Sequence, residues 1–251
     1  MLAGLVTGKQ QLELVEFPDP EPAPGKAVVD IAYCGICGTD LHAFQSGAPY
    51  NPAICGHEWS GTVSAAASDV PVREGDRVAI GIAGACGQCA TCQRGDAGHC
   101  ETAFMGMIGV GPLAAPHGGF ASAIAIDASR LYAVQKSISD VQAAMLEPAT
   151  VALHAVRRTP VRLGDVVVVL GGGPIGLLVG QCARSAGAGK LILVEPEPSR
   201  REIGASVGFD VLVDPASQDT AEIIIAESGH AGADVVFESL ADLNAVLAAI
   251  G

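Results

Sequence analysis

The sequence predicts two domains of different class, a β-rich domain followed by an α/β domain built on a doubly wound parallel sheet. In the first part of the chain, short apolar runs are separated by glycine and proline; after about residue 140, strand and helix patterns alternate. A chain of 251 residues, 49% of them hydrophobic, is long enough for two ordinary domains. We therefore expect domains at residues 1–148 and 149–251.

The first half contains stretches that alternate polar and apolar residues or run apolar, as strands do. The connections between them hold most of the Cys and His residues, which is typical of functional loops on a β scaffold. The expected strands are residues 11–16, 26–33, 61–66, 76–82 and 119–126.

The second half begins with DVVVVL (165–170), the continuous apolar run that a strand buried on both faces requires. Strands that alternate with helices indicate a parallel, doubly wound sheet. The further expected strands are residues 190–195, 209–214 and 233–239, and the expected helices are residues 174–187, 198–206 and 219–228.

Composition excludes several classes of partner. The net charge of −13 and the pI near 4.7 argue against a nucleic-acid partner, because phosphate binding needs clustered Lys and Arg. The most apolar stretch, residues 166–180, is broken by glycines and a proline before it reaches the roughly 20 residues of a membrane span. The start of the chain has no signal-peptide pattern. We expect a cytoplasmic protein without a membrane partner, whose eight cysteines serve as metal thiolates more readily than as disulfides.

A glycine-rich turn follows the first strand of the second half. Gly171, Gly173 and Gly176 match G-x-G-x-x-G, and a predicted helix follows them. In this pattern the first glycine permits a tight turn, the second lets the backbone approach a pyrophosphate, and the third allows close helix–strand packing. The pyrophosphate would rest on the amides of the helix N-terminus. The turn therefore predicts a dinucleotide site.

Charged residues beyond this turn indicate which dinucleotide binds. Glu195 ends the next strand, about 20 residues on, and would accept hydrogen bonds from the adenosine ribose and repel a 2′-phosphate, which favours NAD over NADP. Arg200 and Arg201 weaken this preference, because a nearby arginine accommodates a phosphate. The predicted cofactor-binding residues are Gly171, Gly173, Pro174, Ile175, Gly176, Glu195 and Arg200.

Four cysteines in the stretch CGQCATCQRGDAGHC have metal-ligand spacing, C-x2-C-x2-C-x7-C. A shell of four thiolates is closed and leaves no position for a substrate, so it indicates a structural zinc ion. The bacterial ferredoxin run needs its fourth Cys after three residues, which disfavours an iron–sulfur cluster. The predicted structural zinc ligands are Cys86, Cys89, Cys92 and Cys100.

Further ligand types lie in CGICGTDLH (34–42), CGHEWSG (55–61) and LEPATVALHAV (146–156). With GHE, the four-cysteine lobe and the strand–GGGPIG–helix unit, their order resembles that of the zinc-containing medium-chain alcohol dehydrogenases from about residue 5 to 240. The resemblance implies a GroES-like catalytic domain joined to a Rossmann domain, with the active site in the cleft between them. It also implies a homodimer or homotetramer.

Matched by position to this family, Cys37 and His57 are ligands of a catalytic zinc. Glu147 stands where the liver-type enzymes have a second cysteine ligand, a feature that resembles the polyol, sorbitol and butanediol dehydrogenase branch. In that branch the Glu of GHE, here Glu58, binds the metal directly. We therefore predict Cys37, His57, Glu58 and Glu147 as catalytic zinc ligands, with the two glutamates exchanging. A role for Glu58 outside the coordination shell is the alternative.

The resemblance also assigns three neighbouring residues. Asp40 would hydrogen bond to the ligating histidine, Thr39 would contact the substrate alcohol, and His42 would pass the proton to solvent. These roles imply zinc- and NAD-dependent oxidation of a secondary alcohol, diol or polyol to the ketone, with two zinc ions per chain. The alternatives are a threonine or sugar dehydrogenase of the same family, or a non-catalytic remnant that binds NAD and zinc.

The last residues suggest a shortened second domain. The sequence ends after the fourth predicted strand and one helix, where the family continues with two more strands and a return segment. We therefore expect a partial Rossmann sheet, and a C-terminally truncated chain that lacks the family's usual dimer surface.

Overall fold

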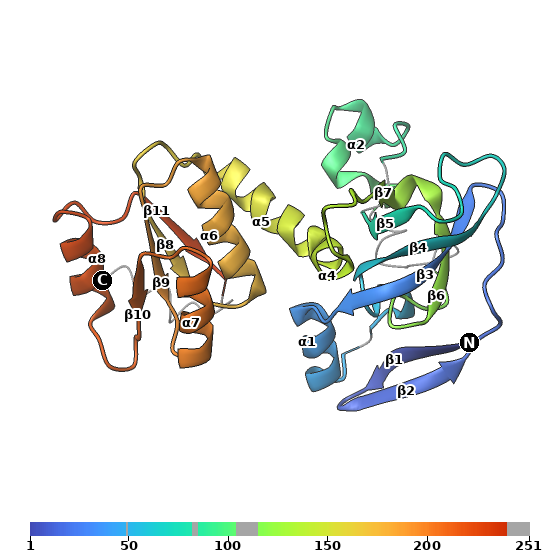
Figure 1. Ribbon diagram of the computed structural model, residues 1–251, viewed down its shortest axis with the longest axis horizontal. Coiled ribbons are helices and arrows are strands. Elements are labelled where there is room, and N and C mark those ends of the chain that lie inside the picture. The colour runs from blue at the N-terminus through green and yellow to red at the C-terminus, as the bar shows by residue number, and fades with distance from the viewer. Residues whose placement is uncertain (49, 82–84, 104–114, 240–251) are drawn as a thin grey trace. The chain divides into compact units, whose positions relative to one another are not determined.

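The computed structural model divides into two compact units, Met1–Glu147 and Pro148–Gly251. It describes residues 1–48, 50–81, 85–103 and 115–239 (Figure 1). The first unit is β-rich and the second is an α/β unit with a parallel sheet, so the predicted fold class is confirmed.

The first unit contains a five-stranded antiparallel sheet of order β6-β3-β4-β5-β7 and a separate ribbon of β1 and β2. Trp59, Val29, Val63 and Val78 form the centre of its core, each at most 2% exposed. The strands are β1 (Leu2–Gly8), β2 (Gln11–Glu16), β3 (Lys26–Gly35), β4 (Glu58–Ala66), β5 (Arg77–Ile80), β6 (Ala123–Asp127) and β7 (Leu131–Ala133).

Short helices connect or follow these strands. Most are only one or two turns long, because glycines and prolines interrupt the loops in which they form. The boundary between the two units falls within α5. The helices are α1 (Gly38–Ser46), η1 (Pro52–Ile54), α2 (Ala90–Gln93), η2 (Ala97–His99), η4 (Ala128–Arg130), α4 (Asp140–Ala144) and α5 (Leu146–Arg158).

The second unit contains a four-stranded parallel sheet of order β10-β9-β8-β11 with helices between successive strands. Val167, Val168 and Val169 are fully buried, as expected for a strand covered on both faces. Its strands are β8 (Val166–Leu170), β9 (Lys190–Val194), β10 (Val211–Val213) and β11 (Val235–Glu238), and its helices are α6 (Pro174–Ala186), α7 (Pro198–Ser206) and α8 (Thr220–Glu227).

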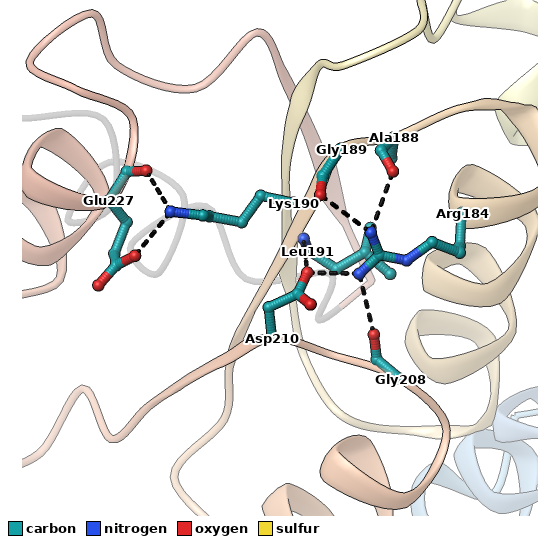
Figure 2. A network of polar contacts seen from close by, with 8 residues as sticks. All are labelled: Arg184, Ala188, Gly189, Lys190, Leu191, Gly208, Asp210 and Glu227. Carbon is teal, nitrogen blue, oxygen red and sulfur yellow. Dashed lines mark hydrogen bonds and ion pairs between the residues drawn. The ribbon is translucent and has the colours of Figure 1, made fainter.

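A polar network closes the amino ends of β9 and β10 (Figure 2). The Arg184 guanidinium donates hydrogen bonds to the carbonyls of Ala188, Gly189 and Gly208 and pairs with the Asp210 carboxylate. Asp210 Oδ2 also accepts a 2.7 Å hydrogen bond from the Leu191 amide. The strands of this sheet are parallel, so the network lies at their amino ends, whereas the glycine-rich turn follows the carboxyl end of β8. We therefore assign the network to stability rather than to ligand binding.

The expected strands are present, with shifted ends. The fifth begins at Ala123 rather than at Gly119, because the amides of Gly119 and Phe120 donate to the carbonyls of Gly56 and Cys55, outside any strand. β1, β7 and helix α1 were not expected. Residue 82 and the expected last helix, within 240–251, lie outside the described residues.

Candidate active site and metal centres

The four cysteines of the predicted structural site converge in the lobe that contains α2 and η2. The Sγ atoms of Cys86, Cys89, Cys92 and Cys100 all lie within 4.8 Å of one another. The 4.0 Å separation of Cys89 and Cys100 Sγ excludes a disulfide, whose sulfurs are about 2 Å apart. It matches the roughly 3.8 Å that tetrahedral geometry gives for sulfurs 2.3 Å from zinc.

Backbone amides around this lobe point at the sulfur atoms. Cys86 Sγ accepts hydrogen bonds from the amides of Gln88 and Cys89, which lower the pKa of its thiol to about 6. Cys100 Sγ accepts from the amides of Cys86 and Ala103. Amides directed at sulfur favour thiolates, the form that binds a metal. The lobe therefore fits a closed zinc site.

A second group of ligands gathers at one end of the β3–β4 pair. Cys37 precedes α1, His57 follows η1, and Glu58 begins β4. One ligand atom from each lies within 4.8 Å of the other two, and all three residues are half-buried. One thiolate, one imidazole and one carboxylate are a donor set that zinc accepts, and three protein ligands leave a position for a substrate. A group that is open in this way can act on a bound substrate, which a closed shell of four thiolates cannot.

The tautomer of His57 suits this role. Its Nδ1 lies 3.0 Å from the Ile54 carbonyl oxygen, which accepts only, so Nδ1 carries the proton. Nε2 is then the ring nitrogen that a metal binds. Burial lowers the pKa of His57, but the hydrogen bonds to Cys37 and Ile54, together with the Asp40 charge, outweigh it and raise the pKa to about 9. A thiol and an imidazole joined by a hydrogen bond are a pair of groups that a metal ion can bind in place of the proton between them.

The expected hydrogen bond from His57 to Asp40 is wrong. Asp40 Oδ1 lies 4.0 Å from His57 Nδ1, beyond hydrogen-bond distance, and Nδ1 donates to the Ile54 carbonyl instead. Asp40 is buried and acts on the backbone instead. Its Oδ2 accepts from the Cys37 amide at 2.8 Å, and its Oδ1 accepts from the Gly56 amide at 3.4 Å. It therefore joins the two segments that present Cys37 and His57.

Tyr50 completes this arrangement and was missed by sequence reasoning. Its hydroxyl donates a 2.5 Å hydrogen bond to Asp40 Oδ1. Burial raises the pKa of this hydroxyl well above its ordinary value, and the hydrogen bond to Asp40 adds to the effect. No motif could have revealed this contact, because Tyr50 lies in a loop of irregular sequence ten residues from Asp40.

The other predicted residues lie around this group. The Thr39 hydroxyl is 3.6 Å from Cys37 Sγ, and Thr39 and His42 are both exposed on α1. Glu147 is not one of the three residues whose ligand atoms gather within 4.8 Å, yet it lies close enough to interact with two of them. Burial raises the pKa of its carboxyl, His57 acts in the opposite direction, and the Glu58 charge adds to the increase.

In the second unit the three motif glycines have the surroundings that a dinucleotide turn requires. Gly171 has φ of +101°, which favours glycine, and its carbonyl oxygen lies 1.9 Å from where a Gly176 Cβ would be. Gly173 is the N-cap of α6, and a Cβ on it would meet nothing within 4 Å. Pro174 occupies N1, where a missing amide costs nothing, and Ile175 packs against the core. Space beside Gly173 and a helix N-terminus fit a pyrophosphate.

Glu195 is more deeply placed than its predicted role suggests. It is 1% exposed, and its carboxylate accepts hydrogen bonds from the amides of Gly172 and Glu197 at 2.6 and 2.9 Å. The Arg200 guanidinium, half-exposed, lies 3.8 Å from it. Arg201 is committed elsewhere, because it donates to the Glu195 and Pro196 carbonyls. Of the two arginines, Arg200 is the one that lies beside the glycine-rich turn, since a Cβ on Gly172 would be 3.3 Å from Arg200 Cβ.

A doubly wound sheet with this turn, and an open Cys, His and Glu group on a β domain, define a metal-dependent dehydrogenase. Family models agree: residues 23–136 match the alcohol dehydrogenase GroES-like domain, and residues 174–250 match the zinc-binding dehydrogenase domain. The chain belongs to the zinc-containing medium-chain alcohol dehydrogenase family, in its polyol branch, and is an oxidoreductase. This confirms the resemblance on which the site residues were predicted.

Individual relatives cover nearly the whole chain. A 2-dehydro-3-deoxy-L-galactonate 5-dehydrogenase from Pseudoalteromonas atlantica is 35% identical over 98% of this chain and 71% of its own length. Sorbitol dehydrogenase from Bacillus subtilis is 30% identical over 100% of this chain and 71% of its own length.

Solved structures agree with these relatives. The 2R,3R-butanediol dehydrogenase of Bacillus subtilis superposes with a TM-score of 0.79 at 30% identity, covering 99% of this chain and 73% of its own. A protein assigned as a zinc-binding dehydrogenase from Sinorhizobium meliloti, solved with NADP, gives 0.81 at 30% identity, covering 98% of this chain and 71% of its own. Among the described residues, no helix is long and apolar enough to cross a membrane.

Proposed function

We propose that this chain oxidises a secondary hydroxyl group of a diol or polyol to the ketone, with NAD as the hydride acceptor. The observation that carries the proposal is the group formed by Cys37, His57 and Glu58, whose ligand atoms lie within 4.8 Å of one another beside the exposed hydroxyl of Thr39. Three ligands from the protein leave a coordination position for the substrate. When bound, zinc supplies Lewis acidity toward the substrate hydroxyl, and the nicotinamide ring supplies the hydride acceptor.

The chain's own residues hold the metal and move the proton. Cys37 and Glu58 contribute negative charge, and His57 contributes Nε2, fixed by the hydrogen bond from Nδ1 to Ile54. Thr39, at the start of α1, accepts the proton of the substrate hydroxyl within a hydrogen-bonded path. His42, one turn further along the same helix, releases it to solvent. Histidine suits this last step, since it exchanges protons near neutral pH.

Glu147 completes the proposed metal site. Burial already favours its protonated form, whereas His57 favours the carboxylate. A cation at the Cys37–His57–Glu58 group would add to the effect of His57 and favour the carboxylate, which supports a role for Glu147 in ligating the metal or in holding a water molecule on it. We propose that Glu58 and Glu147 exchange in this role.

The proposed cofactor is NAD rather than NADP. A buried carboxylate at Glu195, held by the Gly172 and Glu197 amides, leaves a negative charge where the 2′-phosphate of NADP would lie. The half-exposed Arg200 beside it works against this preference. The similar structure from Sinorhizobium meliloti contains NADP, so the choice requires a direct measurement with both cofactors.

The ligand set and the relatives both support a polyhydroxylated substrate. One thiolate with one or two carboxylates is a harder donor set than two thiolates, and it suits oxygen-rich substrates. Sorbitol and butanediol dehydrogenases are among the proteins similar to this chain. The similarity to a 2-dehydro-3-deoxy-L-galactonate 5-dehydrogenase favours a second candidate, oxidation of a secondary hydroxyl on a sugar acid.

A substrate panel tests the proposal. Purified chain, with its intact mass verified, is assayed for reduction of NAD and of NADP with butanediol, sorbitol, a sugar acid, threonine and primary alcohols. We expect activity with NAD on secondary diols or polyols. Activity confined to primary alcohols, or absent with every substrate although zinc and NADH bind, would refute the proposal; the second result would identify a binding module.

A further inference from the structure

The carboxylate of Glu58 lies over a glycine. Gly35, the last residue of β3, pairs with Glu58, the first residue of β4. A Cβ built on Gly35 would lie 2.4 Å from Glu58 Oε2 and 3.2 Å from Glu58 Cβ. The carboxylate that belongs to the metal-ligand group therefore occupies space that any other residue at position 35 would fill.

Backbone conformation does not explain this glycine. Gly35 is absent from the glycines with positive φ, so its backbone is one that alanine also adopts. Gly38, three residues further along the same C-G-I-C-G stretch, also lacks a positive φ, and a Cβ on it would meet nothing within 4 Å. The Glu58 side chain thus lies against Gly35 and not against Gly38.

We propose that Gly35 is the positioning residue that keeps Glu58 in the metal-ligand group with Cys37 and His57, and that a side chain at position 35 turns the Glu58 carboxylate out of this group. The inference rests on the proposed function of the Cys37–His57–Glu58 group as a metal site. Gly35 does not bind the metal, but the absence of a side chain at this position allows Glu58 to bind it.

The direction of the response follows from what can move. β3 and β4 are held by the ladder that pairs Cys34 with Trp59, and Trp59 is 2% exposed in the core. The atom closest to the added methyl group is the end of a flexible side chain, which rotates at lower cost than a packed strand shifts. A Gly35→Ala chain therefore relieves the contact mainly by moving Oε2, away from the space it shares with Cys37 and His57.

The test compares zinc retention in Gly35→Ala with the matched control Gly38→Ala. Each full-length protein is dialysed against increasing concentrations of a chelator such as dipicolinate, and the zinc that remains is measured by mass spectrometry. The wild type is expected to fall from two zinc ions per chain to one as the open site empties. For Gly35→Ala we expect this step at about 10- to 100-fold lower chelator, with the second zinc retained, and for Gly38→Ala no change. Equal curves for the two variants would overturn the proposal.

Removal of the Glu58 side chain separates this proposal from the function on which it rests. Glu58→Ala should itself release zinc early, and Gly35→Ala should add nothing in that background, since the two substitutions act on one contact. If Glu58→Ala holds zinc as the wild type does, Glu58 is not a required ligand and the role of Gly35 fails with it; if Glu58→Ala/Glu147→Ala also holds this zinc, the proposed carboxylate ligation of the metal is wrong. If Glu58→Ala loses zinc and Gly35→Ala does not, only the role of Gly35 is wrong. An additive loss in the double variant would also refute it.

Folding provides a final check. Should Gly35→Ala accumulate as unfolded protein, the Gly35→Ala/Glu58→Ala double variant is examined by circular dichroism. Recovery of the folded state on removal of the Glu58 side chain supports the contact between the two residues, whereas a double variant that remains unfolded contradicts it.

Discussion

Gly173 and Gly176 belong to one turn but have opposite surroundings, and this difference yields a sharp prediction. A methyl group on Gly176 would lie 1.9 Å from the Gly171 carbonyl oxygen and 2.8 Å from Ser239 Oγ. The first of these is a backbone atom, so relief requires α6 to move away from β8. Overpacking costs about 1–3 kcal/mol, and a backbone contact this short belongs near the upper end. Alanine in a helix returns at most about 1 kcal/mol. We expect Gly176→Ala to destabilise the second unit by about 2 kcal/mol.

Gly173→Ala should act on the cofactor instead. Gly173 has φ of −75° and ψ of 177°, which alanine adopts without strain, and the new methyl group would meet nothing within 4 Å. The loss of a glycine N-cap and the lower entropy of the unfolded alanine chain have opposite effects, so stability should change by less than about 0.5 kcal/mol. The methyl group would, however, stand where a pyrophosphate approaches. A clash of about 1–3 kcal/mol would raise the NADH dissociation constant about 5- to 150-fold.

Two measurements on the same proteins check both halves of this reasoning. Urea denaturation followed by circular dichroism gives the stability of the second unit, and NADH fluorescence titration gives affinity. Gly173→Ala should melt as the wild type does and bind NADH weakly, whereas Gly176→Ala should unfold at lower urea. If Gly173→Ala binds NADH with unchanged affinity, the cofactor does not lie against this glycine. If Gly176→Ala is as stable as the wild type, α6 does not need its close approach to β8.

Three further predictions concern the metal sites and the polar network. Cys37→Ser should abolish alcohol oxidation and lower the zinc content from two ions per chain to one while NADH affinity is kept; turnover without this zinc would show that the ligand assignment is wrong. Cys89→Ser should lose the other zinc and lower the thermal stability of the first unit before it affects chemistry, so a variant that melts normally but is inactive would contradict a structural role. Asp210→Asn should be less stable than the wild type by about 1 kcal/mol at pH 7, a value that is reduced because the ion pair is half-exposed. Burial raises the pKa of Asp210, but the Leu191 amide and Arg184 outweigh it and lower the pKa, so the difference is present above the ordinary Asp pKa of about 3.9 and disappears as pH falls below it; a difference that is independent of pH would exclude this mechanism.

The second unit was predictable because its signals are local. A run such as 166–170 is apolar throughout, since β8 is covered on both faces, and the glycine-rich turn follows at once. Helix α1 was missed for the opposite reason. Only Asp40 and Ala43 are buried among its residues, so the stretch has no apolar periodicity to reveal a helix. Its conformation depends on its contacts with the first unit rather than on its own composition.

Ligand types and their spacing could likewise be read from the sequence, but their partners could not. Cys37, His57 and Glu58 were predicted and are gathered by the fold, whereas the hydrogen-bond acceptor of His57 is the Ile54 carbonyl. Every residue carries a carbonyl group, so no residue type marks this contact. The contact between Gly35 and Glu58 could not be predicted either, because the sequence does not distinguish a glycine needed for its missing side chain from one needed for its backbone freedom.

Asp40 shows why part of the metal motif is readable and part is not. It stands at the third position of α1, and its carboxylate returns to the amide of Cys37, the residue before the helix. This is the geometry of a helix cap, which fixes a spacing of three residues, so the interval between Cys37 and Asp40 is a folding signal as well as a chemical one. The other oxygen of Asp40 contacts Gly56 and Tyr50, which lie 16 and 10 residues away and are placed by the loop between them. A buried carboxylate needs several hydrogen-bond donors, and for Asp40 only the Cys37 amide is set by local geometry. The distance between the Cys37 and His57 segments therefore depends on contacts between backbone and carboxylate that the motif alone does not specify.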